Sequence, residues 1–329
     1  MTTPDLTPIY RSPADGSALT RDGDHWVDSN GHHFGARDGV PDLTWPLELE
    51  QEDAETRALY DEIAADYHKY APLPFRTYRC SEHDVREDIT DRLRLTPGMR
   101  VLDVGCGTGD GTTHIARRLE DDGEVHAQDL SPGLLALARR ALAESNVPVY
   151  FSLGNACSLS FSDDAFDAAH HFGGLNTFSD IPGFLAEMAR VVRPGGRVVI
   201  GDEGLGPWLK DTEFGRIMSN SNPLLKFAPP LEHLPVTASN VAVEWIMMGA
   251  FWLIEFTVAA GSPEADYQVR IPSARGGTHW TRYHGNLEGV SDEAKSLAHK
   301  ARAHAGESMH DWLERVVRAE AAREFGEDE

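Results

Sequence analysis

Short apolar runs alternate with amphipathic stretches through the middle of the chain, between residues 99 and 260. The apolar runs have the length of buried strands, and the stretches between them have the spacing of helices. The predicted strands are 99–104, 124–128, 148–153, 168–172 and 197–201. The predicted helices are 112–119, 133–143 and 184–192. Strands that alternate with helices in this way indicate an open α/β sheet whose strands are mostly parallel.

The pattern changes near the carboxyl end of this core. Residues 205–236 are rich in proline and read as irregular. The apolar runs 241–247 and 250–259 follow, and Met248 and Gly249 between them suit a turn. We therefore expect a hairpin at this edge of the sheet.

The flanks of the core differ from it in composition. Residues 1–45 are rich in turn-forming residues, with short candidate strands such as His25–Val27. Residues 46–98 and 261–329 carry amphipathic stretches instead. The helices expected there are 48–70, 82–95, 291–304 and 308–325. We expect four parts in all: an N-terminal segment, a helical segment, the core at 99–260 and a helical C-terminal extension.

The composition of the chain indicates which partners it binds and in which cellular compartment it works. The 329 residues carry a net charge of −23, which repels phosphate backbones, so we expect no nucleic-acid partner. No apolar run is long enough to predict a membrane span, and the first residues do not resemble a signal peptide. The three cysteines are widely spaced and odd in number, which fits a reducing compartment. We expect a cytoplasmic protein.

The strongest chemical signal is the segment Val101–Gly109, which reads V-L-D-V-G-C-G-T-G before a helix. Glycine is needed where a backbone turns sharply and a ligand approaches closely. The start of the helix behind the loop offers unpaired N–H groups and a partial positive charge. A dinucleotide-binding loop would have its third glycine at position 110, but Asp110 stands there and would repel a pyrophosphate. This weakens a dehydrogenase interpretation and favours a ligand with an ammonium group and no phosphate.

The loop resembles the first motif of the class I methyltransferases that use S-adenosylmethionine (SAM), a ligand of that kind. The segments Tyr60–Tyr67 and Arg193–Gly196 also resemble parts of this family, and the resemblance covers roughly residues 58–260. It is strongest to the ubiquinone/menaquinone-type methyltransferases and their small-molecule relatives. The resemblance implies a seven-stranded, doubly wound (Rossmann-like) sheet with an antiparallel final strand. It also implies SAM as the cofactor and S-adenosylhomocysteine (SAH) as the product.

The resemblance further implies which residues hold the cofactor. Asp103 would lie near the methionine ammonium, the N–H groups of the loop near the methionine carboxylate, and Tyr67 near the same end. Asp129 follows the second strand, about 20 residues after the loop, where a carboxylate can accept hydrogen bonds from both ribose hydroxyls. Asn155 stands where the family has an acid, and its amide oxygen can still accept from the adenine amine. The expected cofactor residues are Asp103, Gly105, Cys106, Gly107, Gly109, Asp129, Leu130, Asn155, Ala156, His171 and Tyr67.

Methyl transfer requires little of the protein beyond holding the acceptor in line with the methyl group. A base is needed where the acceptor atom must lose a proton. The candidate bases are His171, Glu203 and His279, of which the last lies in a predicted loop at 275–280. His170 neighbours His171 on one strand, so one of the two can face the site while the other packs. Each of these side chains can also be an ordinary packing or surface residue.

The N-terminal segment resembles the small zinc ribbon that precedes some methyltransferase domains. The positions of the ribbon cysteines hold Ser12, Asp15, Ser29 and His32 in this chain. Structural zinc needs four Cys or His ligands, so this pattern predicts a ribbon remnant without metal. A disordered leader is the alternative. We expect no metal site in the chain.

The motifs leave the methyl acceptor open. A small metabolite is our first expectation, and a polyprenyl quinone would need an apolar channel, which the hairpin at 241–259 could line. Arsenite would need converging thiols, and the spacing of Cys80 and Cys157 shows no pairing. A SAM-binding protein without chemistry is a further alternative, which the intact Asp103, glycines and Asp129 disfavour. The C-terminal helices either dock on the core, which we prefer, or form a homodimer contact.

Overall fold

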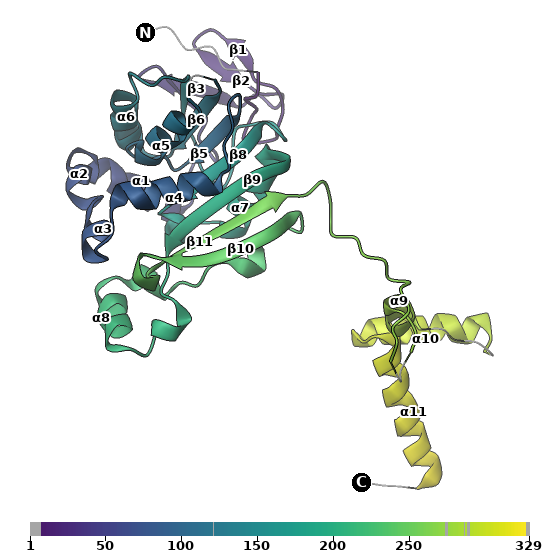
Figure 1. The fold of residues 1–329 in the computed structure, drawn as a ribbon. Coiled ribbons are helices and arrows are strands. Elements are labelled where there is room, and N and C mark those ends of the chain that lie inside the picture. Colours follow the sequence, from purple (N-terminus) through teal and green to yellow (C-terminus); the bar gives the residue numbers. More distant parts are fainter. Residues whose placement is uncertain (1–7, 121, 274–275, 286, 288–289, 327–329) are drawn as a thin grey trace. The chain divides into compact units, whose positions relative to one another are not determined.

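The computed structural model describes residues 8–120, 122–273, 276–285, 287 and 290–326. The chain forms two compact units, Met1–Ser262 and Pro263–Glu329. Figure 1 shows the first unit as a twisted sheet with helices packed against it, and the second as a group of helices. In the part of the chain described, no helix combines the length and the apolar character needed to span a membrane.

One mixed sheet runs through the first unit in the order β1-β2-β3-β4-β7-β6-β5-β8-β9-β11-β10. Its core strands are β5 (Arg100–Val104), β6 (Glu124–Asp129), β7 (Val149–Leu153), β8 (Phe166–Phe172), β9 (Val192–Glu203), β10 (Ala238–Ile246) and β11 (Phe251–Val258). The neighbours β7, β6, β5, β8 and β9 are parallel, and β11 runs antiparallel to β9. Because β5 lies between β6 and β8, the chain leaves it on one side and returns on the other. Such a switch opens a crevice at the carboxyl ends of the strands.

The sheet has eleven strands rather than the seven expected, because the N-terminal segment adds to it. The added strands are β1 (Thr20–Asp22), β2 (His25–Val27), β3 (His33–Arg37) and β4 (Val40–Asp42). β4 lies parallel to β7 and pairs with it through Asp42 and Leu153. Without β4, β7 would be an edge strand with unpaired backbone groups. Trp26 and Phe34 of this segment are buried in the largest apolar core, so the segment packs as part of the first unit.

Hydrogen bonds between polar side chains connect the N-terminal strands and loops. Ser12 Oγ donates to Asp28 Oδ2 over 2.8 Å, and Nδ1 of His32 lies 2.8 Å from the same oxygen. Ser29 Oγ donates to Asp15 Oδ2 over 3.0 Å. The four positions compared above with ribbon cysteines therefore all take part in side-chain hydrogen bonds.

Helices cover both faces of the core sheet. They are α1 (Gln51–Ile63), α2 (Tyr67–Tyr70), α3 (Leu73–Thr77), α4 (Glu82–Arg92), α5 (Asp110–Arg118), α6 (Pro132–Ala141), α7 (Ile181–Val191) and α8 (Glu213–Ser221). Consecutive residues of β5 face different cores: Val101 packs with Ile115 of α5, and Leu102 packs with Phe184 of α7. Burial on both faces explains why the consecutive residues Val101 and Leu102 are both apolar.

Three elements differ from their predictions. The helix expected at 48–70 is divided, since the short 3-10 helix Ala64–Asp66 separates α1 from α2. The R-P-G-G segment Arg193–Gly196 lies inside β9 as an irregularity in its pairing with β8, rather than before the strand. The segment 205–236 contains α8, which begins where Thr212 accepts a hydrogen bond from the backbone N–H of Gly215.

The second unit contains α9 (His279–His284), α10 (Asp292–Ala305) and α11 (Met309–Phe325). Ser308 caps α11 by accepting a hydrogen bond from the backbone N–H of Asp311. The Arg302 guanidinium lies 4.9 Å from the centre of the Tyr283 ring. Arg275 of the predicted loop lies outside the described residues. The loop prediction is wrong for His279, because Thr278 caps a helix that starts there.

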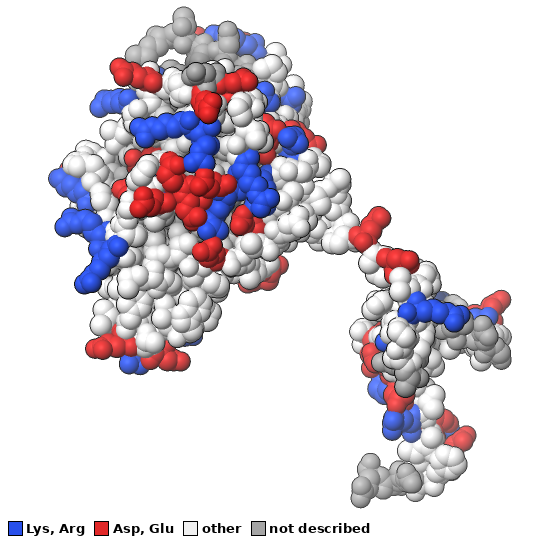
Figure 2. Space-filling view, viewed as in Figure 1, with Lys and Arg blue, Asp and Glu red and all other residues white. Residues whose placement is uncertain are grey.

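The charges of the first unit are interspersed. On the face that Figure 2 shows, acidic and basic side chains lie next to one another over the middle of the unit. Ion pairs between α4 and α5 are an example, since Arg118 contacts both Glu87 and Asp91. Over the middle of this face, basic side chains therefore have acidic neighbours.

Candidate active site

The glycine-rich loop joins the carboxyl end of β5 to the start of α5. Gly105, Gly107 and Gly109 have φ values of +66°, +55° and +84°, which other residues rarely adopt. A Cβ atom at Gly105 would also lie 3.2 Å from Nδ1 of His171. The loop therefore requires glycine both for its turn and for its close approach to β8.

A cavity of about 310 Å³ adjoins this loop. Its walls come from the carboxyl ends of β6, β8 and β9 and from the helical segment that precedes the core, which agrees with the crevice expected at the switch point. The expected cofactor residues that line it are Tyr67, Gly105, Cys106, Gly107, Asp129, Leu130, Asn155, Ala156 and His171. Residues brought together here come from well-separated parts of the sequence.

Asp129 lines the cavity and is held by two backbone groups. Its Oδ2 accepts a hydrogen bond from the N–H of Gly107, and its Oδ1 accepts one from Ser131, each over 2.8 Å. Burial raises the pKa of Asp129 to about 6. The carboxylate thus fixes the glycine loop against the start of α6 and also lines the cavity.

Asp103 lies behind the loop, not in the cavity wall, which differs from its expected contact with the cofactor. Its Oδ2 accepts a hydrogen bond from the Thr112 hydroxyl over 2.6 Å, and its Oδ1 lies 2.8 Å from Nδ1 of His170. Only 2% of its surface is exposed. Gly109 is likewise absent from the cavity lining, because it packs against Ala138 and Leu142.

The two neighbouring histidines of β8 face different surroundings. His170 is paired with Asp103, whereas His171 lines the cavity between the rings of Phe178 and Phe184. His171 Nδ1 donates to the carbonyl of Val104 over 2.8 Å, and its Nε2 is buried without a partner among the described residues. Burial lowers the pKa of His171 to about 4, so its imidazole is neutral at neutral pH.

Asn155 also lines the cavity, and both ends of its amide are engaged. Its Oδ1 accepts the backbone N–H of Cys157 over 3.0 Å, and its Nδ2 donates to Asp53 Oδ2 over 2.9 Å. An amide oxygen has two acceptor sites, so Oδ1 retains one for a ligand. Leu130 and Ala156 give this end of the cavity apolar surface.

Asp53 is a site residue that the sequence analysis missed. It is 3% exposed, and it accepts hydrogen bonds from Asn155 and from both the N–H and the hydroxyl of Ser179. These contacts fix α1 over the cavity. The available signal was its spacing of seven residues from Tyr60, which places both on one face of the helix. Tyr60 also lines the cavity, with its ring 6.2 Å from that of Tyr67.

Two carboxyl groups lie at the end of β9. Asp202 accepts backbone hydrogen bonds from Gly174 over 3.3 Å and from Asn176 over 2.7 Å, and burial raises its pKa to about 7. Glu203 accepts a hydrogen bond from the Asn222 amide over 3.0 Å, and burial raises its pKa as well. Both line the cavity. Asp202 thus holds the loop after β8, while Glu203 is bound only by a side-chain amide.

The third candidate base, His279, belongs to the second unit and begins α9. The residues that line the cavity all belong to the first unit. The role of His279 therefore stays a prediction.

The residues of the cavity fit SAM. A positively charged sulfonium and ammonium suit a cavity with several carboxyl groups, including Asp129, Asp202 and Glu203. Gly105, Gly107 and Gly109 have no Cβ atoms, which leaves their backbone open to the approach of a carboxylate. Asp129 presents acceptor oxygens next to that loop.

Known proteins match this part of the chain. A family model described as a methyltransferase domain matches residues 101–196. The demethylmenaquinone methyltransferase of Symbiobacterium thermophilum is 33% identical over 156 residues, which cover 47% of this chain and 61% of that protein. The same-named enzyme of Bacillus licheniformis is 40% identical over 119 residues, which cover 36% of this chain and 51% of that protein. The chain thus spans only about half to three fifths of the length of these relatives.

A solved structure agrees in fold. The phosphoethanolamine N-methyltransferase 2 of Haemonchus contortus, in complex with SAM, has a TM-score of 0.50 and 16% identity, and the likeness covers 67% of this chain and 62% of that one. Identity at this level supports the fold alone. The segment matched by the family model contains the glycine loop, Asp129, Asn155 and His171. Residues 101–196 are therefore a class I SAM-dependent methyltransferase domain similar to that of the demethylmenaquinone methyltransferases.

Proposed function

We propose that this protein transfers the methyl group of SAM to a small-molecule acceptor and releases SAH. The observation that carries the proposal is the single cavity that extends from Gly105 in the glycine loop to Glu203 at the end of β9. The end of the cavity beside the loop would hold the cofactor. The other end, lined by apolar side chains and two carboxyl groups, would hold the acceptor. Bound SAM would supply an electrophilic methyl group on its sulfonium.

Cofactor binding rests on the residues around the glycine loop. Asp129 accepts hydrogen bonds from the ribose hydroxyls, and the N–H groups of the loop bind the methionine carboxylate. Leu130 and Ala156 pack on the adenine. Asp103 acts indirectly, because its bonds to Thr112 and His170 hold α5 against β5 and β8 and so fix the loop between them.

The acceptor end of the cavity is apolar with an acidic edge. The apolar side chains that line it are Phe75, Phe172, Leu224, Met247 and Phe251. Asp202 and Glu203 lie among them and would repel an anionic acceptor. This combination favours an uncharged acceptor with an apolar body and a weakly acidic hydroxyl. Glu203, whose pKa burial raises, takes the proton of that hydroxyl.

A demethylated quinone is a second candidate acceptor, with transfer to carbon. It is favoured by the name that the matched relatives share and by the apolar end of the cavity, which suits an aromatic ring. The two candidates share the cofactor site and differ only in the atom that receives the methyl group.

The first test is calorimetric titration of the whole chain with SAM and with SAH. Wild type should bind both, and Asp129→Ala should bind at least about tenfold more weakly, because a charge-assisted hydrogen bond contributes roughly 1.5–3 kcal/mol. Asp163→Ala is the matched control, since that carboxyl is exposed and pairs with Arg190 outside the cavity. Circular dichroism would verify that the variants are folded.

A labelled-methyl screen then identifies the acceptor. Hydroxy-aromatic compounds and quinols should be methylated, whereas phosphorylated analogues should not. Absence of SAM and SAH binding in the wild type would contradict the proposal outright. Binding without transfer to any tested acceptor would support a SAM-binding protein without chemistry instead.

A further inference from the structure

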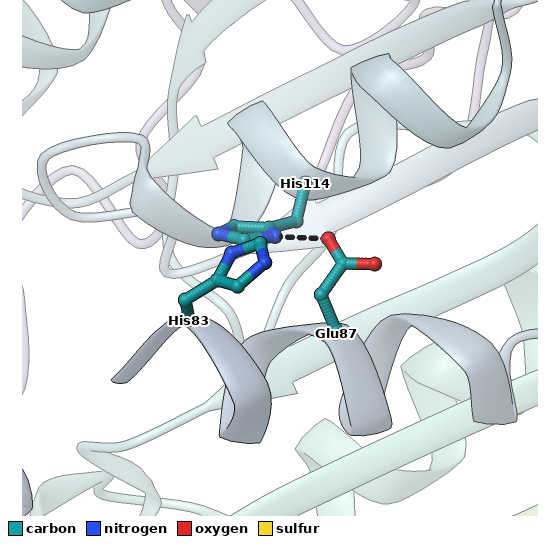
Figure 3. Close-up of side chains that lie close together, drawn as sticks. All are labelled: His83, Glu87 and His114. Atoms are coloured by element: carbon teal, nitrogen blue, oxygen red, sulfur yellow. Dashed lines mark hydrogen bonds and ion pairs between the residues drawn. The ribbon is translucent and has the colours of Figure 1, made fainter. Parts of the chain in front are cut away.

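Outside the cavity, three metal-ligating side chains converge between α4 and α5, as Figure 3 shows. His83 and Glu87 lie one helical turn apart on α4, and His114 points toward them from α5. One ligand atom from each lies within 4.8 Å of the other two. Within the described part of the chain, no other group of three His, Cys, Asp or Glu side chains has this geometry.

The donor set suits a divalent transition metal. Two imidazole nitrogens and one carboxylate oxygen are ligands that Zn²⁺ accepts, with Co²⁺ and Ni²⁺ as chemical relatives. Ligand atoms around one Zn²⁺ lie about 2.0–2.2 Å from the ion. The three side chains, with ligand atoms within 4.8 Å of one another, have the spacing to hold one such ion.

Glu87 is already oriented for this role. Its Oε1 lies 2.6 Å from Nδ1 of His114, while its Oε2 accepts a hydrogen bond from Arg118 over 2.6 Å. Both contacts hold the Glu87 carboxylate in the space between α4 and α5. Arg118 occupies Oε2 and leaves Oε1 to face the imidazole. Asp91 offsets the charge of Arg118 by pairing with its other nitrogen.

His83 supplies the free donor of the group. Its side chain is exposed, and it forms no hydrogen bond or ion pair with any described residue. Its ring lies 5.2 Å from the His114 ring, centre to centre. The two imidazoles are therefore close enough to share one cation.

We propose that His83, Glu87 and His114 bind one divalent transition-metal ion of the Zn²⁺ class, with water completing its coordination. The ion joins α4 to α5. Both helices also border the cavity, because α5 begins at Asp110 directly after the glycine loop and α4 carries Arg86. Metal binding thus stiffens one wall of the cavity without touching the cofactor. This proposal reverses the expectation that the chain has no metal site.

Titration of the whole chain with Zn²⁺, and separately with Co²⁺, tests the proposal. Wild type should bind one ion per chain, and the Co²⁺ form should show the intense visible absorption of four-coordinate cobalt. Loss of an outer hydrogen-bond partner of a metal site already costs about 10–100-fold in affinity. His83→Ala, which removes a ligand, should therefore cost at least tenfold, and Glu87→Gln should do the same while preserving the shape of the side chain.

His68→Ala is the matched control, because His68 is an exposed helical histidine outside the group. It should bind Zn²⁺ as wild type does. Zn²⁺ should also raise the Tm of wild type and of His68→Ala, but not of His83→Ala. Unchanged Zn²⁺ affinity in both His83→Ala and Glu87→Gln would overturn the proposal, as would a six-coordinate Co²⁺ spectrum in the wild type.

Discussion

At the scale of single residues, two acids at the ends of neighbouring strands have different partners. Asp129 bonds backbone N–H groups at the cavity, whereas Asp103 bonds Thr112 and His170 behind the loop. Both are buried. A buried carboxylate needs hydrogen bonds, and the groups within reach decide whether its remaining acceptor sites face a ligand. Only Asp129 has such sites at the cavity.

The pKa of Asp129, about 6, predicts that SAM affinity depends on pH. The carboxylate form accepts the ribose hydroxyls, so the affinity should fall as the pH drops below about 6, by up to roughly tenfold per unit. Calorimetry between pH 5 and 7.5 would measure this dependence. It should persist in Asp163→Ala and flatten in Asp129→Ala. An equally steep dependence in Asp129→Ala would assign it to another group, such as Asp202.

His171 predicts that the stability of the fold also depends on pH, because its burial disfavours the protonated imidazole. Its pKa is about 4 when folded and 6.5 when unfolded, so the unfolded chain takes up a proton first as the pH falls. The free energy of unfolding should therefore decrease from pH 6.5 toward pH 4, by about 3 kcal/mol from this residue. Urea unfolding of wild type and His171→Gln at several pH values would isolate it, because Asp129 and Asp202 contribute equally to both. Identical slopes would contradict the prediction.

At the scale of elements, α1 is held over the cavity by polar contacts. Asp53 bonds Asn155 and Ser179, and Asp61 accepts hydrogen bonds from the Ser131 hydroxyl over 2.5 Å and from the N–H of Gly133 over 3.1 Å. The contacts of Asp61 place its carboxylate at the N-terminus of α6, where the helix dipole favours negative charge. Each end of α1 is thus fixed to the core by an acid.

Gly133 permits the close approach of α1 to α6, and its replacement predicts a weaker cofactor site. A Cβ at this position would lie 2.9 Å from Ala64 Cβ and 3.2 Å from Asp61 Oδ1. Gly133→Ala should therefore displace the end of α1 and lower SAM affinity several-fold, since Tyr60 and Tyr67 line the cavity from the same segment. Alanine by itself favours a helix by about 1 kcal/mol over glycine, so Tm should change little.

Gly261→Ala is the control for that substitution, because a Cβ there has nothing within 4 Å. SAM affinity and Tm of the three proteins would be measured together. Wild-type affinity in Gly133→Ala would show that α1 tolerates displacement and would remove its assigned role in binding.

At the scale of the whole molecule, the chain divides near residue 262. The eleven-stranded sheet and every residue of the cavity lining lie in the first unit. The second unit has contacts of its own, such as Arg302 over the Tyr283 ring. We therefore predict that the first unit binds the cofactor by itself.

A chain that ends at Ser262 is predicted to fold and to bind SAM within about twofold of the full chain, because the cavity lining is unchanged. Calorimetry with SAM would test this.

Measurement of methyl transfer distinguishes the candidate bases. Glu203→Gln should reduce kcat by about 10²-fold or more, as loss of a general base does, and His279→Ala should not. Loss of transfer in His279→Ala with intact SAM binding would instead assign the base to the second unit.

Sequence alone determined the features that depend on near neighbours in the chain. The alternation of apolar strands and amphipathic helices and the glycine loop are local features, because periodicity and φ act within a few residues. The position of Asp129 at the end of β6 follows from the same local pattern.

Only the tertiary structure decided which groups meet across long stretches of sequence. The bond from Asp53 to Ser179 spans 126 residues, and the pairing of β4 with β7 joins two parts that no sequence period connects. Three further features depend on packing in the same way. Asp103 bonds Thr112 rather than lining the cavity, His171 lines the cavity, and His83 lies close to His114. Such contacts depend on how the strands and helices pack, and packing between distant segments leaves no local signal in the sequence.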